Sequence, residues 1–438
     1  MSYELDASGQ SRLGRYFDGI GAILKRQDRR ESFALYAMGL FGDGERKSVE
    51  PIASRACGDP ALCRAYHDRL LHFVGVAPWS DDAVREYAAH YGVDAMTVRE
   101  PVSDWIVDDT GFPKQGDKSP GVQRQYSGTA GRIENSQVAV YLTYAAPRGH
   151  ALIDRALYLP RSWADDRDRC ADAGIPNRQR GFATKPALAV ALIDRAVAAK
   201  VPAAWVAGDE VYGADPRLRA AVRGHGLGYV LAIAANRRVP TDAGLIRVDA
   251  LPALIPAHAW QKHSAGAGAH GPRLYSWAWF RLLAEDDTDT GVHHLLIRRN
   301  DATGELAYLR CYSPRPAPLR TLVSVAGQRW RIEESFQAAK GLVGLDQHQV
   351  RRWRSWHRWT TLAMLAHAFL AVATAIERDS APTPAGLIAL TVNEFRRLFD
   401  ALLLATNHTV ATLLAWSRWR RRHQYRARLS HYRRRENQ

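Results

Sequence analysis

Three short acidic clusters hold the residues best suited to chemistry. Their sequences are Val-Asp-Asp-Thr-Gly-Phe at 107–112, Gly-Asp-Glu-Val-Tyr-Gly at 208–213 and Arg-Trp-Arg-Ile-Glu-Glu-Ser-Phe-Gln-Ala-Ala-Lys at 329–340. Carboxylate oxygens are the hard ligands that Mg²⁺ prefers, and carboxylates from separate elements can hold two ions. Two ions about 3.5–4 Å apart can activate an attacking oxygen and stabilise the leaving oxygen of a phosphodiester. The clusters therefore predict metal-dependent phosphoryl chemistry.

The 438-residue chain is basic outside these clusters, with 60 Lys and Arg against 45 Asp and Glu and a formal net charge of +15. Such an excess favours a polyanionic partner, with general solubility as the alternative explanation. Basic and aromatic residues mix densely at 351–359, where Arg351, Arg352 and Arg354 are expected to contact DNA. The basic segment 418–435 is either a further DNA contact or a solvated terminus.

Composition disfavours several classes of protein. The four cysteines form no Cys-x-x-Cys pair and no array with histidine, so a disulfide framework is not expected. The N-terminus lacks a signal pattern, and no uninterrupted apolar stretch reaches the roughly 18 to 20 residues that span a bilayer. We therefore expect a cytoplasmic protein without a membrane partner.

The pattern of apolar residues predicts an α/β fold. Helical spacing dominates up to about residue 95, and short apolar runs separated by turn residues then predict strands. A helix over 186–200 followed by a strand at 203–207 fits a crossover connection. The expected organisation is a helical region 1–95, a core in two parts at 96–235 and 313–378, a β-rich insertion 236–312, and a helical basic region 379–438.

The first two acidic clusters each follow an apolar run, as active-site residues often do at a sheet edge. Side chains alternate along a strand, so Asp108 and Asp109 are expected to face opposite sides and only one can join a given site. Asp209 repeats the arrangement after 203–207. The alternative for the first pair is a simple turn cap.

Helical geometry divides the third cluster into two stripes. Arg329, Glu333, Gln337 and Lys340 fall on one stripe, so a carboxylate lies between two cations there. Ile332 and Phe336 belong to the adjacent apolar stripe, which would pack on the sheet. Ordinary helical salt bridging, worth about 0.2 to 0.5 kcal/mol per pair, is the alternative explanation.

These motifs resemble those of bacterial insertion-sequence transposases of the DDE superfamily, in the branch with a Tyr-Arg-Glu-Lys signature and most closely the insertion sequence 701-type members. The resemblance rests on Asp-Asp-Thr-Gly-Phe-Pro-Lys at 108–114, Arg-Gln-Tyr-Ser-Gly-Thr-Ala-Gly-Arg at 124–132, and the segments 208–213 and 329–346. It implies a ribonuclease H-like catalytic core, interrupted by a β-rich insertion and flanked by helical N-terminal and C-terminal regions.

The resemblance also implies site residues. It assigns the catalytic and metal-binding triad to Asp109, Asp209 and Glu333, and the signature cations that contact DNA to Arg329 and Lys340. The signature tyrosine, three residues before the arginine, is replaced by Ala326. Any phosphate contact that this tyrosine makes in relatives must therefore come from elsewhere.

The implied reaction is cleavage at transposon ends with two Mg²⁺ ions, with Mn²⁺ as a substitute, followed by joining of the 3′-hydroxyl to target DNA. The implied partners are double-stranded DNA, as terminal inverted repeats and target, and a second copy of the chain. Many relatives stack a flipped base on an aromatic ring, for which Trp277, Trp279 and Trp260 are candidates; a core role is the alternative for each.

Two other functions remain open from the sequence. One is a transposase-derived DNA-binding regulator that does not cut DNA, and the other is a nuclease of the same fold that does not join strands. The presence of all three acidic residues argues against the first.

Overall fold

The fold is organised around one large mixed sheet. The computed structural model describes residues 7–404, apart from 43, 58, 99–103, 129–130, 269–270, 285–289, 381–382 and 384–386. The basic segment 418–435 lies outside these residues. In the ten-stranded sheet the order is β2-β3-β1-β5-β6-β12-β11-β10-β9, with β4 also paired with β3. Its strands are β1 (Asp104–Pro113), β2 (Gln123–Ser127), β3 (Arg132–Ala146), β4 (Gly149–Leu157), β5 (Trp205–Gly208), β6 (Gly228–Ile233), β9 (Gln261–Gly268), β10 (Gly271–Leu282), β11 (Val292–Arg299) and β12 (Leu306–Ser313).

The centre of the sheet is parallel and the rest is antiparallel. β1, β5 and β6 run in the same direction, whereas β3 runs against β1. Parallel neighbours need crossover connections, and the chain supplies them with α8 (Lys185–Ala198) before β5, and with α9 (Glu210–Gly213) and α10 (Pro216–Gly224) before β6. The mixed α/β fold class expected from the sequence is confirmed.

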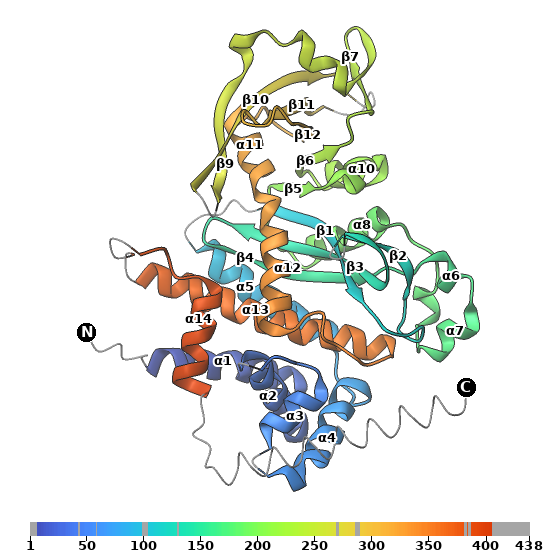
Figure 1. The fold of residues 1–438 in the computed structure, drawn as a ribbon, viewed down its shortest axis with the longest axis vertical. Helices are drawn as coiled ribbons and strands as arrows, with labels where there is room; N and C mark the ends of the chain where they lie inside the picture. The colour runs from blue at the N-terminus through green and yellow to red at the C-terminus, as the bar shows by residue number, and fades with distance from the viewer. Residues whose placement is uncertain are drawn as a thin grey trace.

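Helices cover the two faces of the central strands. Ile106 of β1 shares a hydrophobic cluster with α11 (Leu319–Gln328) and α12 (Trp330–Val343), which lies across the sheet in Figure 1. Val107, the next residue, shares the other cluster with α8 and α10. Alternate β1 side chains therefore enter different cores, as strand geometry requires.

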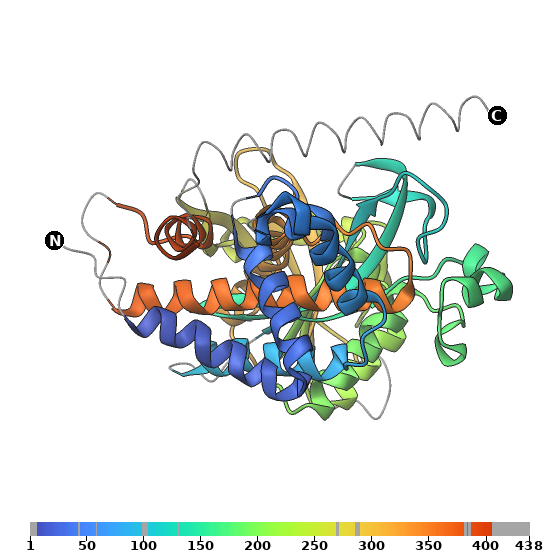
Figure 2. The same ribbon diagram turned by 90° about the horizontal axis from the view of Figure 1, so that it is seen from below.

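A long apolar helix, α13 (Trp353–Ser380), packs beneath the sheet and against the N-terminal helices (Figure 2). It is the one helix among the described residues long and apolar enough to cross a membrane, but 94% of its most apolar window is buried, as in the core helix of a soluble fold. Its Arg358 donates hydrogen bonds to the carbonyls of Ala77 (2.6 Å) and Trp79 (2.8 Å). The helices around it are α1 (Ala7–Leu24), α2 (Gln27–Phe41), α3 (Val49–Ala56), α4 (Cys63–Gly75) and α5 (Asp81–Thr97).

The β-rich stretch after β6 is joined to the core sheet. It begins with a small two-stranded sheet of β7 (Arg238–Thr241) and β8 (Gly244–Arg247), followed by β9 to β12. β12 pairs antiparallel with β6, from Tyr308 opposite Ile233 to Tyr312 opposite Tyr229. The central sheet and the insertion strands therefore form one continuous hydrogen-bonded surface. The remaining helices are α6 (Arg161–Ala164), α7 (Arg167–Asp172) and α14 (Val392–Phe399).

Candidate active site

The two aspartates of β1 lie on opposite faces of the sheet. Asp108 is opposite Tyr141 of β3, whose ring packs edge-on against Phe336 of α12 at 5.4 Å between centroids. Thr110, two residues further along β1, accepts a hydrogen bond from Lys340 of α12 at 2.8 Å. Asp108 therefore lies on the face that α12 covers. Asp109 belongs to the other face.

Asp109 has its own partners on the α8 face. Lys185 at the start of α8 places its Nζ 2.8 Å from Oδ2 of Asp109. The Tyr212 hydroxyl of α9 donates to Oδ1 at 3.4 Å. This carboxylate is therefore neutralised and held by groups of the protein itself.

Asp209 lies beside the middle of β1 because of the strand register. Val107 pairs with Gly208, the last residue of β5, so Asp108 and Asp209 are the next residues on two neighbouring parallel strands. Asp209 caps α9 by accepting from the Val211 N–H at 2.9 Å. Gly213 allows α9 to lie close to β6, since a Cβ there would be 1.9 Å from the Ala232 carbonyl oxygen.

Burial and neighbouring carboxylates disfavour the charges of Asp108 and Asp209. Burial is the main cause that raises the pKa of Asp108 to about 7, and the carboxylates of Asp209 and Asp109 contribute to this increase. Burial is also the main cause of the raised pKa of Asp209, with Asp109 adding to it. Among the described residues, no cation forms an ion pair with Asp108 within 4 Å.

On the α12 helix, Glu333 forms an ion pair with Arg329. The Arg329 guanidinium is 2.9 Å from Oε1 of Glu333. Its positive charge also opposes the increase in the pKa of both Asp108 and Asp209. The neighbouring Glu334 instead contacts His150 at 3.3 Å, and this contact is the main reason that its pKa falls to about 2. Glu333, unlike Glu334, therefore shares Arg329 as a charged neighbour with the two aspartates.

The basic side chains around this site are partly buried. Lys340 donates to Thr110 and to the carbonyl of Gly111, and burial lowers its pKa. Lys114 at the end of β1 donates to the His348 carbonyl at 2.6 Å, and burial lowers its pKa to about 8. Ala326, in the place of the signature tyrosine, is partly buried against the core cluster on α11.

The donor chemistry fits a divalent cation, although the carboxylates are not drawn together around one. Among the residues that the structure describes, no three His, Cys, Asp or Glu side chains are close enough to hold a metal ion. Asp108 and Asp209 offer hard oxygens whose repulsion a cation would relieve. Glu333 would have to leave Arg329 to join them.

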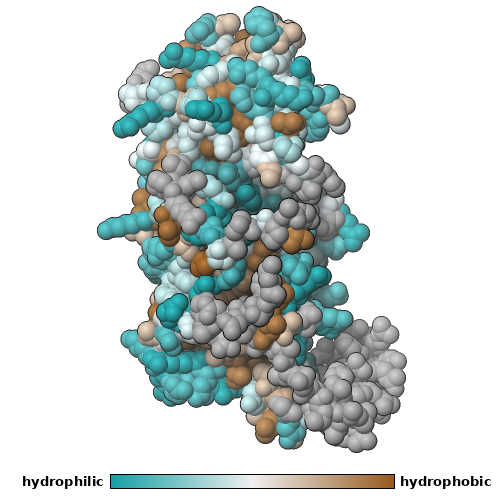
Figure 3. Space-filling view, turned by 90° about the vertical axis from the view of Figure 1, so that its left-hand side faces the viewer, coloured by the Kyte–Doolittle hydropathy of each residue, from teal (hydrophilic) through white to brown (hydrophobic). Residues whose placement is uncertain are grey.

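The three arginines predicted to contact DNA after the α12 helix lie on the surface. Arg351, Arg352 and Arg354 are exposed, and Arg352 donates to the carbonyl of Asp172. Figure 3 shows one side of the molecule as mainly hydrophilic with small separate apolar patches.

The prediction of Trp277 as a DNA contact is not supported by its position. Only 1% of Trp277 is exposed, and its indole N–H donates to the His263 carbonyl at 3.2 Å. It packs in the core cluster that contains α11, so it cannot stack on a base in this arrangement. Trp279 is 36% exposed and stacks on His294, with ring centroids 4.4 Å apart. Trp260 is partly buried, with the Arg299 guanidinium 4.2 Å from its ring centroid.

Sequence reasoning missed Lys185, Tyr212, Lys114 and His348 as members of this region. Lys185 lies 76 residues from Asp109, and no local pattern indicates their contact. Tyr212 and Lys114 fall inside the motifs at 208–213 and 108–114, so their position in those motifs was the available signal.

Comparison with known proteins agrees with the class that this fold and site define. The family described as DDE superfamily endonuclease matches residues 17–250, more than half of the chain, and the chain belongs to that family. It is also 26% identical over 212 residues to a protein of Microchaete diplosiphon named as a probable transposase for insertion sequence element IS701. That match covers 48% of this chain and 50% of the relative, so the chain spans about half the length of that relative. The family resemblance seen in the sequence is confirmed.

One solved structure is similar to the chain over most of its length. It is the cryo-EM structure of a piggyBac transposase synaptic complex with hairpin DNA, at 11% sequence identity and a TM-score of 0.40. The similarity covers 90% of this chain and 76% of that one.

Proposed function

We propose that this protein is a transposase that cleaves DNA at transposon ends with divalent metal ions and joins the 3′-hydroxyl ends to target DNA. The observation that carries the proposal is the strand register, which sets Asp108 within β1 beside Asp209, the residue that follows the adjacent parallel strand β5. Glu333 of α12 is linked to this pair through Arg329, whose charge acts on both aspartates. Membership of the DDE superfamily endonuclease family and similarity to a probable insertion-sequence transposase support it.

We propose Asp108, Asp209 and Glu333 as the ligands of the metal ions. Asp108 takes the place of the predicted Asp109 because it shares the α12 face, whereas Asp109 is paired with Lys185 on the other face. When bound, Mg²⁺ or Mn²⁺ would supply an activated oxygen nucleophile and stabilise the leaving oxygen. The residues fit hard cations of this kind because all three offer carboxylate oxygens.

Arg329 and Lys340 would act on the DNA backbone. Arg329 pairs with Glu333, and a phosphate of the bound strand is a competing partner of the same charge. Transfer of the guanidinium to a phosphate would free the Glu333 carboxylate for the site. Lys340 donates to Thr110, two residues from Asp108 on the same face of β1, and from there its positive charge would attract a phosphate.

The proposed partners follow from this chemistry. Double-stranded DNA is the substrate, both as element ends and as target, and the net charge of +15 supports a polyanionic partner. Joining two ends to one target calls for two active sites, so we propose that two subunits act together on DNA. A cytoplasmic location follows from this role.

A plasmid carrying the element ends provides the test. The native protein with Mg²⁺ should cut at the ends, and addition of EDTA should stop cleavage. Asp108→Asn, Asp209→Asn and Glu333→Gln should each abolish it, whereas Asp109→Asn should retain cleavage. Undiminished cutting by all three of the first variants would overturn the assignment of the site.

A second substrate separates cleavage from joining. A pre-cut end with a free 3′-hydroxyl should be joined to a target duplex by the native protein. Cutting without joining would identify a nuclease of this fold. Specific binding to the ends without cutting would identify a DNA-binding regulator.

A further inference from the structure

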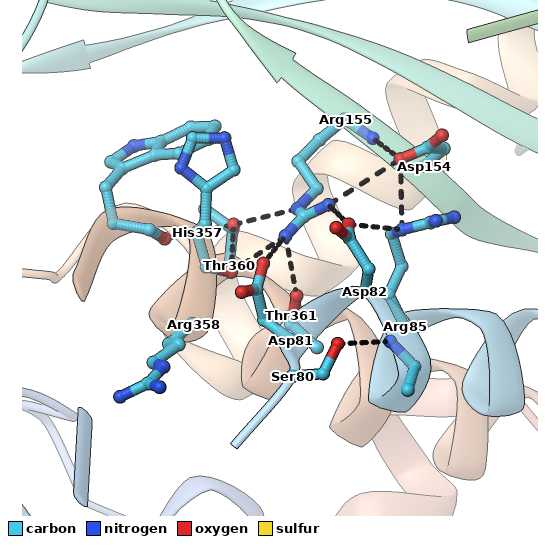
Figure 4. A network of polar contacts seen from close by, with 12 residues as sticks. Ser80, Asp81, Asp82, Arg85, Asp154, Arg155, His357, Arg358, Thr360 and Thr361 are labelled. Carbon is cyan, nitrogen blue, oxygen red and sulfur yellow. Dashed lines mark hydrogen bonds and ion pairs between the residues drawn. The ribbon is translucent and has the colours of Figure 1, made fainter. Parts of the chain in front are cut away.

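A cavity of about 570 Å³ lies at the edge of the sheet, outside the group of carboxylates proposed to bind metal. It is enclosed by the start of α5, the end of β4, the loop before α8, the middle of α8 and the first turn of α13. Its volume lies within the range of about 300–1,000 Å³ typical of small-ligand pockets. Some of its polar walls appear in Figure 4.

The cavity is next to the proposed active site by two routes. Along the sheet, Asp108 is opposite Tyr141, which is opposite Arg155 in the cavity wall. Two strand spacings of about 4.8 Å put the Asp108 and Arg155 backbones roughly 10 Å apart. Along α8, Lys185 contacts Asp109, and Leu188 lines the cavity less than one turn later.

The floor of the cavity is a neutralised and well-ordered network. The buried Arg155 guanidinium donates to Asp81 at 2.7 Å and to the Thr361 hydroxyl at 2.9 Å (Figure 4). Asp154 is shared between Arg85 at 3.3 Å and Arg195 at 2.9 Å. These charges satisfy one another, so they shape the cavity and leave little charge for a ligand.

Two other arginines at the cavity have no such partners. Arg178, in the loop before α8, and Arg354, in the first turn of α13, both line it and are exposed. Neither forms an ion pair with a carboxylate within 4 Å among the residues that the structure describes. Two exposed guanidinium groups that line one cavity suit a phosphate, which accepts paired N–H donors.

The aromatic wall of the cavity offers a different kind of contact. Trp353 and His357 pack with ring centroids 4.4 Å apart. Nδ1 of His357 lies 2.9 Å from the Trp353 carbonyl oxygen, which can only accept, so Nδ1 carries the proton. Burial lowers the pKa of His357 to about 4, with Arg155 adding to the effect, and the ring is neutral at pH 7. Its Nε2 is therefore an acceptor on an aromatic surface.

We propose that this cavity binds one nucleotide of a single DNA strand, with the base against Trp353 and His357 and the phosphate between Arg178 and Arg354. Aromatic faces and cations together are the usual means of gripping unpaired nucleotides. The Nε2 acceptor favours bases with an exocyclic amine. The proposal rests on the proposed function only in taking DNA as the polyanion, because binding here requires no metal and no cleavage.

A fluorescein-labelled single-stranded octanucleotide, titrated into the full chain in EDTA, tests the phosphate contact. The double variant Arg178→Gln/Arg354→Gln should bind about tenfold more weakly at low salt. Loss of two phosphate contacts should also reduce the slope of log affinity against log salt by about 1.4. The matched control, Arg26→Gln/Arg64→Gln, removes two exposed cations of the N-terminal helices and should change affinity less than twofold. Equal losses in both double variants would overturn the proposal.

Modified probes test the base. An octanucleotide with 2-aminopurine at one position should change fluorescence on binding to the native protein and much less with the double variant. A fully abasic octanucleotide should bind at least fivefold more weakly; equal affinity would mean that no base is held. If deoxyadenosine monophosphate binds as tightly as the octanucleotide, the occupant is a free nucleotide and the strand assignment is overturned.

The active-site variant Asp209→Asn separates this proposal from the proposed function. It should keep the affinity for the octanucleotide within twofold in EDTA while losing cleavage in Mg²⁺. Failure of the cavity variants to weaken binding would leave the cleavage assignment standing. Failure of cleavage would leave the binding result standing.

Discussion

The neighbouring aspartates on the two faces of strand β1 have opposite electrostatic environments. On the α8 face, Asp109 is paired with Lys185 and accepts from Tyr212. On the α12 face, Asp108 forms no ion pair within 4 Å among the residues that the structure describes, and burial with the nearby Asp209 raises its pKa to about 7. One residue along the chain thus separates a carboxylate that is already neutralised from one whose charge is unfavourable without an added cation. This difference in pairing is the reason for proposing Asp108, and not Asp109, as a metal ligand.

Exchange of the two aspartates for asparagine is the strongest test of this contrast. Asp108→Asn should lower the rate of DNA cleavage on the order of a thousandfold, or about 4 kcal/mol, because it removes a proposed ligand of the metal. Asp109→Asn should lower it less than tenfold. Initial rates on element-end DNA in Mg²⁺ measure both, and thermal unfolding checks that both variants fold. The reverse ranking would return the assignment to Asp109.

Asp104 tests how far burial alone raises the pKa of an aspartate on the α12 face of β1. It lies four residues before Asp108 on β1, and burial raises its pKa to about 7. The folded state therefore binds the proton more tightly than the unfolded state, and stability falls as pH rises from about 4 to about 7. Asp104→Asn should leave stability at pH 4 nearly unchanged and increase it at pH 8 by up to about 4 kcal/mol.

Denaturant unfolding at a series of pH values measures the Asp104 effect as the difference between native protein and variant. This difference isolates Asp104, because the contribution of Asp108 is common to both proteins. A difference that does not vary with pH would show that the Asp104 carboxyl is not shifted upward by burial.

Substitution of Lys185 tests whether its ion pair with Asp109 stabilises the fold. Lys185→Met should destabilise the fold by about 2 kcal/mol, because Asp109 is left partly buried without its cation. The double variant Lys185→Met/Asp109→Asn should recover part of that loss. Chemical denaturation of the two single variants and the double variant gives the coupling energy. A coupling near zero would mean that the ion pair does not hold Asp109.

Thr110 provides the smallest and most local test. Thr110→Val keeps the side-chain volume but removes the hydroxyl that accepts from Lys340. We expect cleavage to fall about fivefold, corresponding to about 1 kcal/mol, with stability changed by a similar amount. Ser at this position keeps the hydroxyl and should restore the rate, which separates positioning of Lys340 from simple packing.

The sequence predicted the fold class and much of the third acidic cluster. Helical periodicity separated Glu333 from the apolar stripe of α12, and this stripe does pack into the core at Ile332 and Phe336. Strand alternation also predicted that Asp108 and Asp109 face opposite sides. Strand alternation alone does not predict which face of the sheet holds the proposed metal site, because that depends on where α8 and α12 pack against the sheet.

Long-range packing explains the other differences from the sequence predictions. Trp277 and Trp279 are two residues apart on β10, yet only the first belongs to the core cluster with α11. The cavity residues come from segments between positions 81 and 357, which no local pattern connects. Such features depend on tertiary contacts and are not encoded in the short-range spacing of residue types.

The pairing of β12 with β6 gives the insertion a mechanical role. β12 pairs with β6, and β11, β10 and β9 follow it in that order across the sheet. On its other side, β6 pairs with β5, which leads into the Asp209 turn. Four strand spacings of about 4.8 Å extend this surface by roughly 19 Å beyond β6. The backbone hydrogen bonds between neighbouring strands resist bending of a continuous sheet. A force applied to β9 would therefore be transmitted through β10, β11, β12 and β6 to β5. The insertion and the Asp209 turn are therefore expected to keep their relative orientation when the insertion is displaced.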